Sequence, residues 1–559
     1  MTTATTAPEA PASVGQVAGG NALAGTRTLI RFALRRDRIR LPVWILALLL
    51  GTLMTANSFS TLYSDPQDRA NAARSMGSPA GLAMSGPRHY LDDYGFGFGF
   101  GFGSMLSHQM LGFMAVLVGL MSVLIITRHT RAEEETGRAE LVRSTVVGRH
   151  AHLAAALSVA VLANLALALL LAFGLAGLGM EGIDTAGSLL YGFGHAAVGL
   201  VFAAVAAVTV QLTAHTRGAS GMALAVVGVA YVLRAAGDSG ENGTLSWLSP
   251  IGWVQRSYPY VDNRWWPLLL CLALAVACAA AGFALSTRRD VGAGLRPEKL
   301  GRPTASDALT TPLGFALRLH RGMLIGFGAG LFLMGAMYGS ILGDAEDMLK
   351  DIDQIQEALD RIGGAGVAES FASMVMVVLT VVAAVYVVMA ALRPRSEETA
   401  GRAEPLLATG LSRARWVGGH LAVAMGGGTV VLLLAGLGFG IAGAASTGDA
   451  GLLPDLVGAA LAYAPALWVT VGVAVVLFGW FPRASQAAWI VPVYAFVVGY
   501  LGQILQFPTW MNNLSPFGHV PRLPAADMDW TPLLLLSLVA AGLVWLGLAG
   551  FRRRDLETK

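Results

Sequence analysis

Charged side chains are scarce in this sequence of 559 residues, where Asp, Glu, Lys and Arg together account for only 13%. A soluble globular chain carries roughly 25% charged residues. Hydrophobic residues reach 55%, and the mean hydropathy is +0.60. A soluble chain of this length would divide into about three or four domains with charged surfaces. The composition excludes that class of protein.

Lysine is the rarest charged residue, found only at Lys299, Lys350 and Lys559. A P-loop needs a lysine at the end of a GxxxxGK[ST] segment, and the sequence contains no such segment. The chain therefore cannot hydrolyse ATP, and we expect neither a catalytic residue nor a bound cofactor in it. If ATP drives its function, ATP and Mg must bind to a partner chain.

Cysteine is similarly rare. Cys271 and Cys278 lie in one apolar run with no charged residue or histidine beside them, so we interpret both as packing residues. A metal-ligand motif of the HExxH type is also missing from the sequence. We therefore predict no metal site, and a membrane enzyme is the least favoured class.

Long apolar runs are abundant. About 20 helical residues cross a ~30 Å hydrocarbon core, and runs near that length recur along the chain, as at 105–127. Because they lack the alternation typical of a transmembrane β-barrel, they predict an all-α polytopic membrane protein. The twelve predicted transmembrane helices lie at 41–60, 105–127, 151–179, 189–213, 218–236, 267–286, 322–342, 371–392, 418–445, 453–479, 486–505 and 532–551.

Positive charge is unevenly distributed over the loops between these spans. If the N-terminus is inside, cytoplasmic segments hold 29 of the 38 Lys and Arg residues, and outer loops hold eight. Loops rich in Lys and Arg stay in the cytoplasm. We therefore predict that both chain termini are cytoplasmic.

The sequence repeats itself in order. "TLIRFALRRDR" at 28–38 matches "TPLGFALRLHR" at 311–321, and "LSPIGWV" at 248–254 matches "LSPFGHV" at 514–520. Each half holds six predicted spans, and an even number makes the two repeats parallel, as in a pseudo-dimer. The predicted organisation is a disordered cytoplasmic tail at 1–25, a first transmembrane half at 26–289, a cytoplasmic linker at 290–310 and a second transmembrane half at 311–559.

Two charged segments repeat most closely, "RAEEETGRAEL" at 131–141 and "RSEETAGRAEP" at 395–405, which we call the first and second duplicated segments. Seven of their first ten positions are identical, although most of the surrounding apolar sequence differs. Both lie in the predicted cytoplasmic loop after the second span of their half. Two equivalent sites indicate a partner with two equivalent surfaces. The candidate docking residues are Arg131, Glu133, Glu134, Gly137, Arg138, Glu140, Arg395, Glu397, Glu398, Gly401, Arg402 and Glu404.

Two alternatives compete with docking. Any cytoplasmic loop can be a solvated charged helix, and a proton-coupled multidrug antiporter can also have six plus six parallel spans. Proton coupling needs a titratable group at depth, but no Asp or Glu falls in the middle of a predicted span. His195 and His420 do, and a single histidine in a span is usually a helix–helix hydrogen bonder.

The duplicated segments and the residues after them, "EEETGRAELVRSTVVGR" and "EETAGRAEPLLATGLSR", resemble the coupling segment of type-2 ABC transporter permeases. The fused twelve-span form with "GRAE" in both halves is similar to actinobacterial permeases that export polyketide antibiotics. The resemblance covers nearly the whole chain from about residue 26. The second copy departs from the first at Thr399, opposite Glu135, and at Pro405, opposite Leu141. These departures predict docking sites of unequal strength.

This resemblance implies the permease subunit of an ATP-driven exporter in a bacterial cell membrane. Its partners would be two copies of a separate ABC ATP-binding subunit, the lipid bilayer and a hydrophobic or amphiphilic small molecule of drug or antibiotic type, with no nucleic acid. A cavity lined by apolar residues, with Gln211 or Asn164, would suit such cargo. For the Phe-Gly stretch at 94–103, a mobile interfacial flap and a neutral insertion both stay open.

Overall fold

The computed structural model describes residues 21–63, 65, 69–70, 72–73, 76–77, 79–93, 101–240, 243–290, 292–296, 303–340, 342–343, 367–501 and 508–556. The chain forms two compact units, Met1–Lys299 and Leu300–Lys559. Residues 1–20 of the predicted tail, most of the Phe-Gly stretch and parts of the linker lie outside the described residues. The domain boundaries that we placed at 25, 289 and 310 stay predictions.

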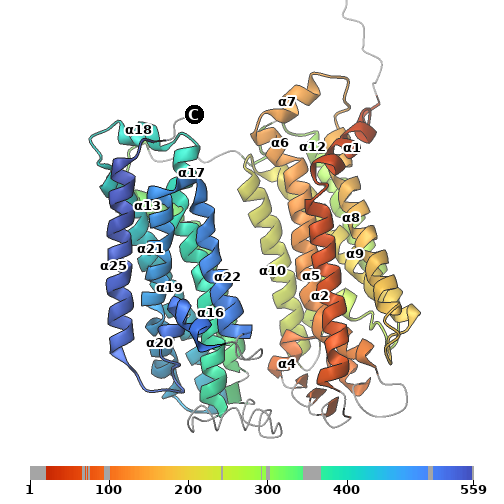
Figure 1. Ribbon diagram of the computed structural model, residues 1–559. Helices are drawn as coiled ribbons and strands as arrows, with labels where there is room; N and C mark the ends of the chain where they lie inside the picture. The colour runs from red at the N-terminus through yellow and green to blue at the C-terminus, as the bar shows by residue number, and fades with distance from the viewer. Residues whose placement is uncertain are drawn as a thin grey trace, which may run out of the picture. The chain divides into compact units, whose positions relative to one another are not determined.

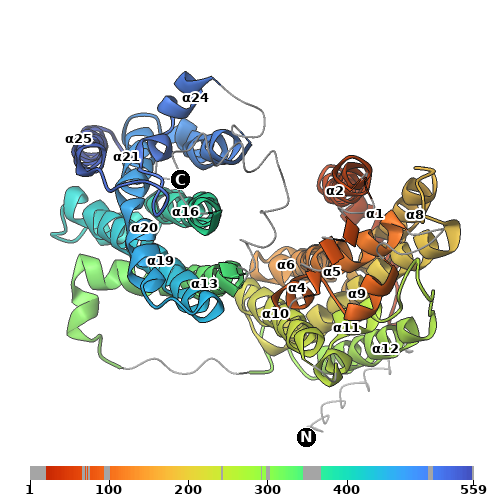
Figure 2. The same ribbon diagram turned by 90° about the horizontal axis from the view of Figure 1, so that it is seen from below.

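The first unit is a bundle of long helices (Figure 1). Seen along their axes, α5 and α9 lie in the interior of the unit, with the other long helices around them (Figure 2). In the most apolar window of α9, 72% of the residues are buried, against 17% in α12, which fits α12 as a lipid-facing helix. The helices are α1 (Thr26–Arg36), α2 (Arg40–Leu62), α4 (Pro79–Met84), α5 (Phe102–His129), α6 (Arg131–Glu135), α7 (Arg138–Arg143), α8 (Ala151–Ala176), α9 (Thr185–Leu212), α10 (Thr216–Ser239), α11 (Pro250–Gln255) and α12 (Trp266–Ser286).

The second unit is also a helical bundle (Figure 1). The first and third long helices, at 312–340 and 413–447, pack closely on each other. A Cβ on Gly335, Gly339 or Gly438 would collide with backbone atoms of the facing helix. Glycine at such positions lets two helices approach each other. The helices are α13 (Pro312–Ser340), α16 (Val367–Ala391), α17 (Arg393–Thr399), α18 (Ala403–Leu407), α19 (Arg413–Thr447), α20 (Leu452–Ala462), α21 (Ala464–Trp480), α22 (Ile490–Phe496), α24 (Thr509–Leu514) and α25 (Trp530–Arg553).

The prediction of an all-α polytopic membrane protein is confirmed. Within the described residues, eleven helices are long and apolar enough to cross a bilayer, counting α20 and α21 as one. The span predicted at 486–505 is not among them. That region holds a 3₁₀ segment at Pro482–Trp489, the short α22 and a π-helical turn at Val497–Leu501, and it then leaves the described part of the chain. The number twelve therefore stays a prediction.

The two "FALR" segments differ in how they enter the first long helix. In the first unit, a break after Arg36 separates α1 from α2. Asp37, at the break, is 2% exposed and pairs with Arg128 at 2.9 Å and with His129 at 2.6 Å. In the second unit, α13 continues through the equivalent position, where His320 is buried. The helix therefore begins ten residues before the predicted span.

Candidate functional site

Each duplicated segment folds into two short helices, α6 and α7 in the first unit and α17 and α18 in the second. In each segment one glycine separates the two helices, Gly137 with φ 73° and Gly401 with φ 72°. A Cβ at either position would have open space around it. The left-handed backbone is therefore the reason for glycine, because residues with a side chain seldom adopt it.

In the first segment, Arg131 and Glu134 point into the protein. The Arg131 side chain is 0% exposed, and its Nε and Nη1 donate to the carbonyl oxygens of Val210 and Ala293, both at 3.1 Å. The Glu134 carboxylate accepts from Arg131 at 2.8 Å. It also forms a bidentate ion pair with Arg289, with N–O distances of 2.7 and 2.8 Å. These contacts fix α6 against the residues that follow α12.

The second segment repeats this arrangement with different residues. The Glu398 side chain is 2% exposed and forms a bidentate ion pair with Arg554, with N–O distances of 2.6 and 2.7 Å. Arg395 lies 3.5 Å from the same carboxylate, as Arg131 lies beside Glu134. In both units, the second glutamate of the segment is thus held by an arginine that follows the last long helix.

We did not predict Arg289 and Arg554 as site residues from the sequence. Both stand in the tripeptide "RRD", at 288–290 and 553–555, just after the last predicted span of each half. The recurrence of this tripeptide at equivalent positions could have identified both arginines. Each arginine also contacts the fourth span of its unit, because Arg289 Nε donates to Gln211 Oε1 at 2.6 Å and Arg554 lies 5.0 Å from the ring centre of Phe478.

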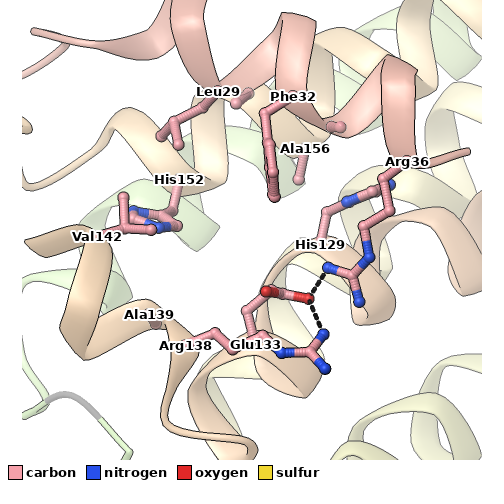
Figure 3. Close-up of a pocket in the computed structure, with 12 residues that line it drawn as sticks. Leu29, Phe32, Arg36, His129, Glu133, Arg138, Ala139, Val142, His152 and Ala156 are labelled. Carbon is pink, nitrogen blue, oxygen red and sulfur yellow. Dashed lines mark hydrogen bonds and ion pairs between the residues drawn. The ribbon is translucent and has the colours of Figure 1, made fainter.

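The first glutamate of each segment has one equivalent partner in the two units, Arg138 or Arg402, and one partner that differs. Glu133 pairs with Arg36 of α1 and lies 3.9 Å from Arg138 (Figure 3). Glu397 instead accepts from Arg393 at 2.8 Å and from Arg402 at 2.5 Å, both within or next to its own segment. The hydrogen bond that Arg402 donates to Glu397 raises the pKa of the Arg402 guanidinium. Glu133 therefore attaches the first segment to α1, whereas Glu397 pairs with arginines within or next to the second segment.

The second helix of each segment presents the same face outward. Ala139 and Ala403 are both 2% exposed and pack inward. The residues on either side of each alanine are exposed in both units. The exposed positions are Arg138, Glu140 and Leu141 in the first unit, and Arg402, Glu404 and Pro405 in the second.

Two small cavities lie beside the first segment. One of about 40 Å³ is lined by residues of α1, α5, α6, α7 and α8, among them Phe32, Glu133 and Ala139 (Figure 3). The other, of about 30 Å³, lies next to Glu134 and Arg289. A site for a drug-sized ligand usually measures about 300–1,000 Å³. Both cavities are therefore too small to hold cargo.

Other polar residues singled out in the spans have internal partners. Gln211 binds Arg289, and the Asn164 amide donates to Ser122 Oγ at 3.0 Å, so the expectation that either residue faces cargo is not supported. His195 bonds to the backbone oxygen of Tyr191 at 2.8 Å. His420 bonds to His320 at 2.9 Å.

A buried charged cluster near one end of α10 was not anticipated. Arg234 is 0% exposed, and Asp238 is 6% exposed with a side-chain oxygen 3.8 Å from it. Arg256 lies 3.1 Å from the same carboxylate, and Ser246 donates to it at 2.6 Å. Buried charges are normally paired in this way. The cluster fixes the short segment after α10 against that helix.

Known proteins resemble the chain along most of its length. The family model described as "Multidrug efflux system permease Rv1217c, C-terminal domain" matches residues 98–285 and 309–552. The multidrug efflux system permease protein Rv1217c of Mycobacterium tuberculosis (strain ATCC 25618 / H37Rv) is 42% identical over 543 residues. That alignment covers 96% of each chain.

Proposed function

Since the chain belongs to the family of multidrug efflux system permeases, we propose that it is the membrane subunit of an ATP-driven ABC exporter. Two copies of a separate ATP-binding subunit would dock on its two duplicated segments. Both segments and both termini would lie on the cytoplasmic side of a bacterial cell membrane. The chain supplies the transmembrane path, and the partner supplies the ATP and Mg site.

One observation carries the proposal. Seven consecutive positions, 135–141 in the first segment and 399–405 in the second, follow the same order of exposed, half-buried and buried residues. A loop that is only solvated requires polar residues, but it does not require the same residues to be exposed in both copies. Two equivalent faces suit a partner present in two copies. Arg138, Glu140, Arg402 and Glu404 would then touch the partner.

The remaining candidate docking residues act from behind that face. Arg131, Glu397 and Glu398 are buried, and the side chains of Glu133, Glu134 and Arg395 are 8–14% exposed. All six are paired within the permease. They would hold the docking helices in place, and Gly137 and Gly401 would set the angle between the two helices of each segment. ATP-driven closure of the partner subunits would move both segments, and the attached helices would turn the path from inward to outward facing.

The cargo is proposed to be hydrophobic or amphiphilic small molecules of drug or polyketide-antibiotic type, moved outward. The name of the Mycobacterium tuberculosis relative supports drug efflux. The scarcity of charge along the spans supports apolar cargo, because a charged substrate would need charged partners at depth.

The test is reconstitution of the chain in proteoliposomes with ABC ATP-binding subunits of the same organism. We expect an assembled complex, drug transport that requires ATP, and ATP hydrolysis stimulated by the permease. Charge reversal of the exposed Glu140 and Glu404 to Lys should weaken assembly and lower stimulated hydrolysis. Reversal of the buried glutamates is a poorer test, because it would also break the internal ion pairs.

The matched control is reversal of Asp307, an exposed acid outside both duplicated segments. Drug transport driven by a proton gradient without ATP, with no subunit bound, would overturn the proposal and favour an antiporter.

A further inference from the structure

We propose that Arg289 and Arg554 are positioning residues, each of which holds one duplicated segment in the orientation that presents its outward face to an ATP-binding subunit. This inference rests on the proposed function and extends it to residues outside the segments. We call each arginine the anchor of its segment. It follows the last transmembrane helix of its unit and is far along the chain from the segment that it holds.

The geometry is the same in the two units. Each arginine meets a glutamate through two parallel N–H···O contacts of 2.6–2.8 Å. The pairs are largely screened from water, with side-chain exposures of 7% and 8% for Arg289 and Glu134, and of 14% and 2% for Arg554 and Glu398. A bidentate guanidinium–carboxylate pair fixes direction as well as distance.

Each arginine joins three spans of its unit. The glutamate continues the second span, Gln211 or Phe478 ends the fourth span, and the arginine itself follows the last span. In the first unit, residues 295 and 296 also donate backbone hydrogen bonds to Gln211 and Leu212 at 2.9 Å. In the second unit, Arg413 donates to the carbonyl oxygen of Arg554 at 2.6 Å. A shift of a docked segment is therefore carried directly to the last helix.

Stability alone does not explain a buried ion pair in both places. Replacing such a pair with well-packed apolar residues is often neutral or stabilising. A charged pair with fixed geometry instead specifies one arrangement, and the same arrangement occurs twice on sequences that otherwise differ. Orientation of the segment is what both copies share.

The first experiment is hydrogen–deuterium exchange on the full-length permease without partner. Arg289→Gln should speed exchange about tenfold in residues 131–141, and Arg554→Gln should do so in residues 395–405. The other segment of the same molecule should be unchanged, which shows that the chain is folded. Arg288→Gln and Arg553→Gln are matched controls, because these exposed arginines are the immediate neighbours.

The second experiment counts ATP-binding subunits by native mass spectrometry, using the subunit that co-purifies with the wild-type permease. Wild type should carry two copies, and each single glutamine variant should carry one. Arg289→Lys and Arg554→Lys should give intermediate exchange and occupancy, because lysine keeps the charge and cannot form the bidentate pair.

The outcomes separate the two claims. Unchanged exchange in the glutamine variants, or equal acceleration in the controls, would overturn the anchor. Faster exchange with both subunits still bound would overturn the positioning role. If exchange responds as expected but wild type binds no ATP-binding subunit, the anchor stands, and the proposed function fails together with the docking role.

Discussion

The two duplicated segments share an inner attachment and differ in an outer one. Inside, Glu134 and Glu398 meet equivalent arginines after the last helix of each unit. At the first glutamate, Glu133 pairs with Arg36 on α1 as well as lying near Arg138, whereas Glu397 pairs with Arg393 as well as with Arg402. Under the proposed function, the shared contacts would orient both segments for docking, and the differing contacts would let the two docking sites be altered separately.

The first segment is tied in this way to an amphipathic helix. On α1, Phe32 is 59% exposed, and Arg31 and Arg35 are also exposed. A helix with apolar and basic residues on its surface suits the membrane interface. The second segment has no comparable tie within the described residues, because α13 continues straight through the equivalent position, where Leu319 replaces Arg36.

The largest effect is expected from breaking the shared attachment. Glu134→Ala or Glu398→Ala leaves a buried arginine without its carboxylate, which should lower the free energy of unfolding of that unit by about 3–5 kcal/mol. Glu134→Ala should be the more severe, because the arginines it leaves unpaired, Arg131 and Arg289, have side-chain exposures of 0% and 7%. The corresponding Arg395 and Arg554 are each 14% exposed. Thermal unfolding in detergent measures the change. Thr136→Ala and Thr399→Ala, at exposed positions, are the controls, and equal losses in the controls would refute the buried-pair account.

A smaller effect is expected at the break between α1 and α2. Asp37→Asn removes the charge that Arg128 and His129 share and should cost about 1.5–3 kcal/mol. Exchange in α1 should rise, while exchange in α13 should not, since His320 stands at that position. Arg38→Gln, at an exposed neighbour, is the control. Unchanged protection of α1 in Asp37→Asn would show that this ion-pair cluster does not hold the helix.

Making the first segment resemble the second should have a modest effect. Arg36→Leu removes a partly exposed ion pair worth about 0.2–1 kcal/mol. The affinity of the first docking site should therefore fall up to about fivefold, with the second site unaffected. A two-site binding titration resolves this, with Arg35→Leu as the control. A loss at both sites would contradict the separate adjustment of the two segments.

The smallest effect is expected from exchanging residues on the outward face. Pro405→Leu gives the second segment the exposed leucine that Leu141 provides in the first. Docking at the second site should tighten by about 1 kcal/mol or less, which is at most about fivefold. The same titration detects it. Weaker binding would mean that proline is needed there to begin α18.

Most of the fold could be predicted from the sequence, because the length of each apolar run is enough to identify a membrane-spanning helix. Eleven of the predicted spans coincide with long helices in the described part of the chain. The span predicted at 486–505 stays a prediction, because residues 502–507 lie outside the described part of the chain. Its described part holds short 3₁₀, α and π segments, which hydropathy alone does not distinguish from one long helix. Likewise, identity between the duplicated segments identified a candidate site but not which of its charges face inward. Glu134 and Glu140 look alike in sequence, and only the distant Arg289 distinguishes them.

Cysteine cross-linking from the outward faces tests the central claim most directly. Cys271 and Cys278 would be replaced by Ala, and a single cysteine placed at Glu140 or Glu404, with Trp265→Cys at an exposed position before α12 as the control. The account predicts that Glu140→Cys and Glu404→Cys each capture one ATP-binding subunit, that both together capture two, and that the control captures none. A transport-competent complex in which neither position cross-links, or in which the control does so equally, would contradict it.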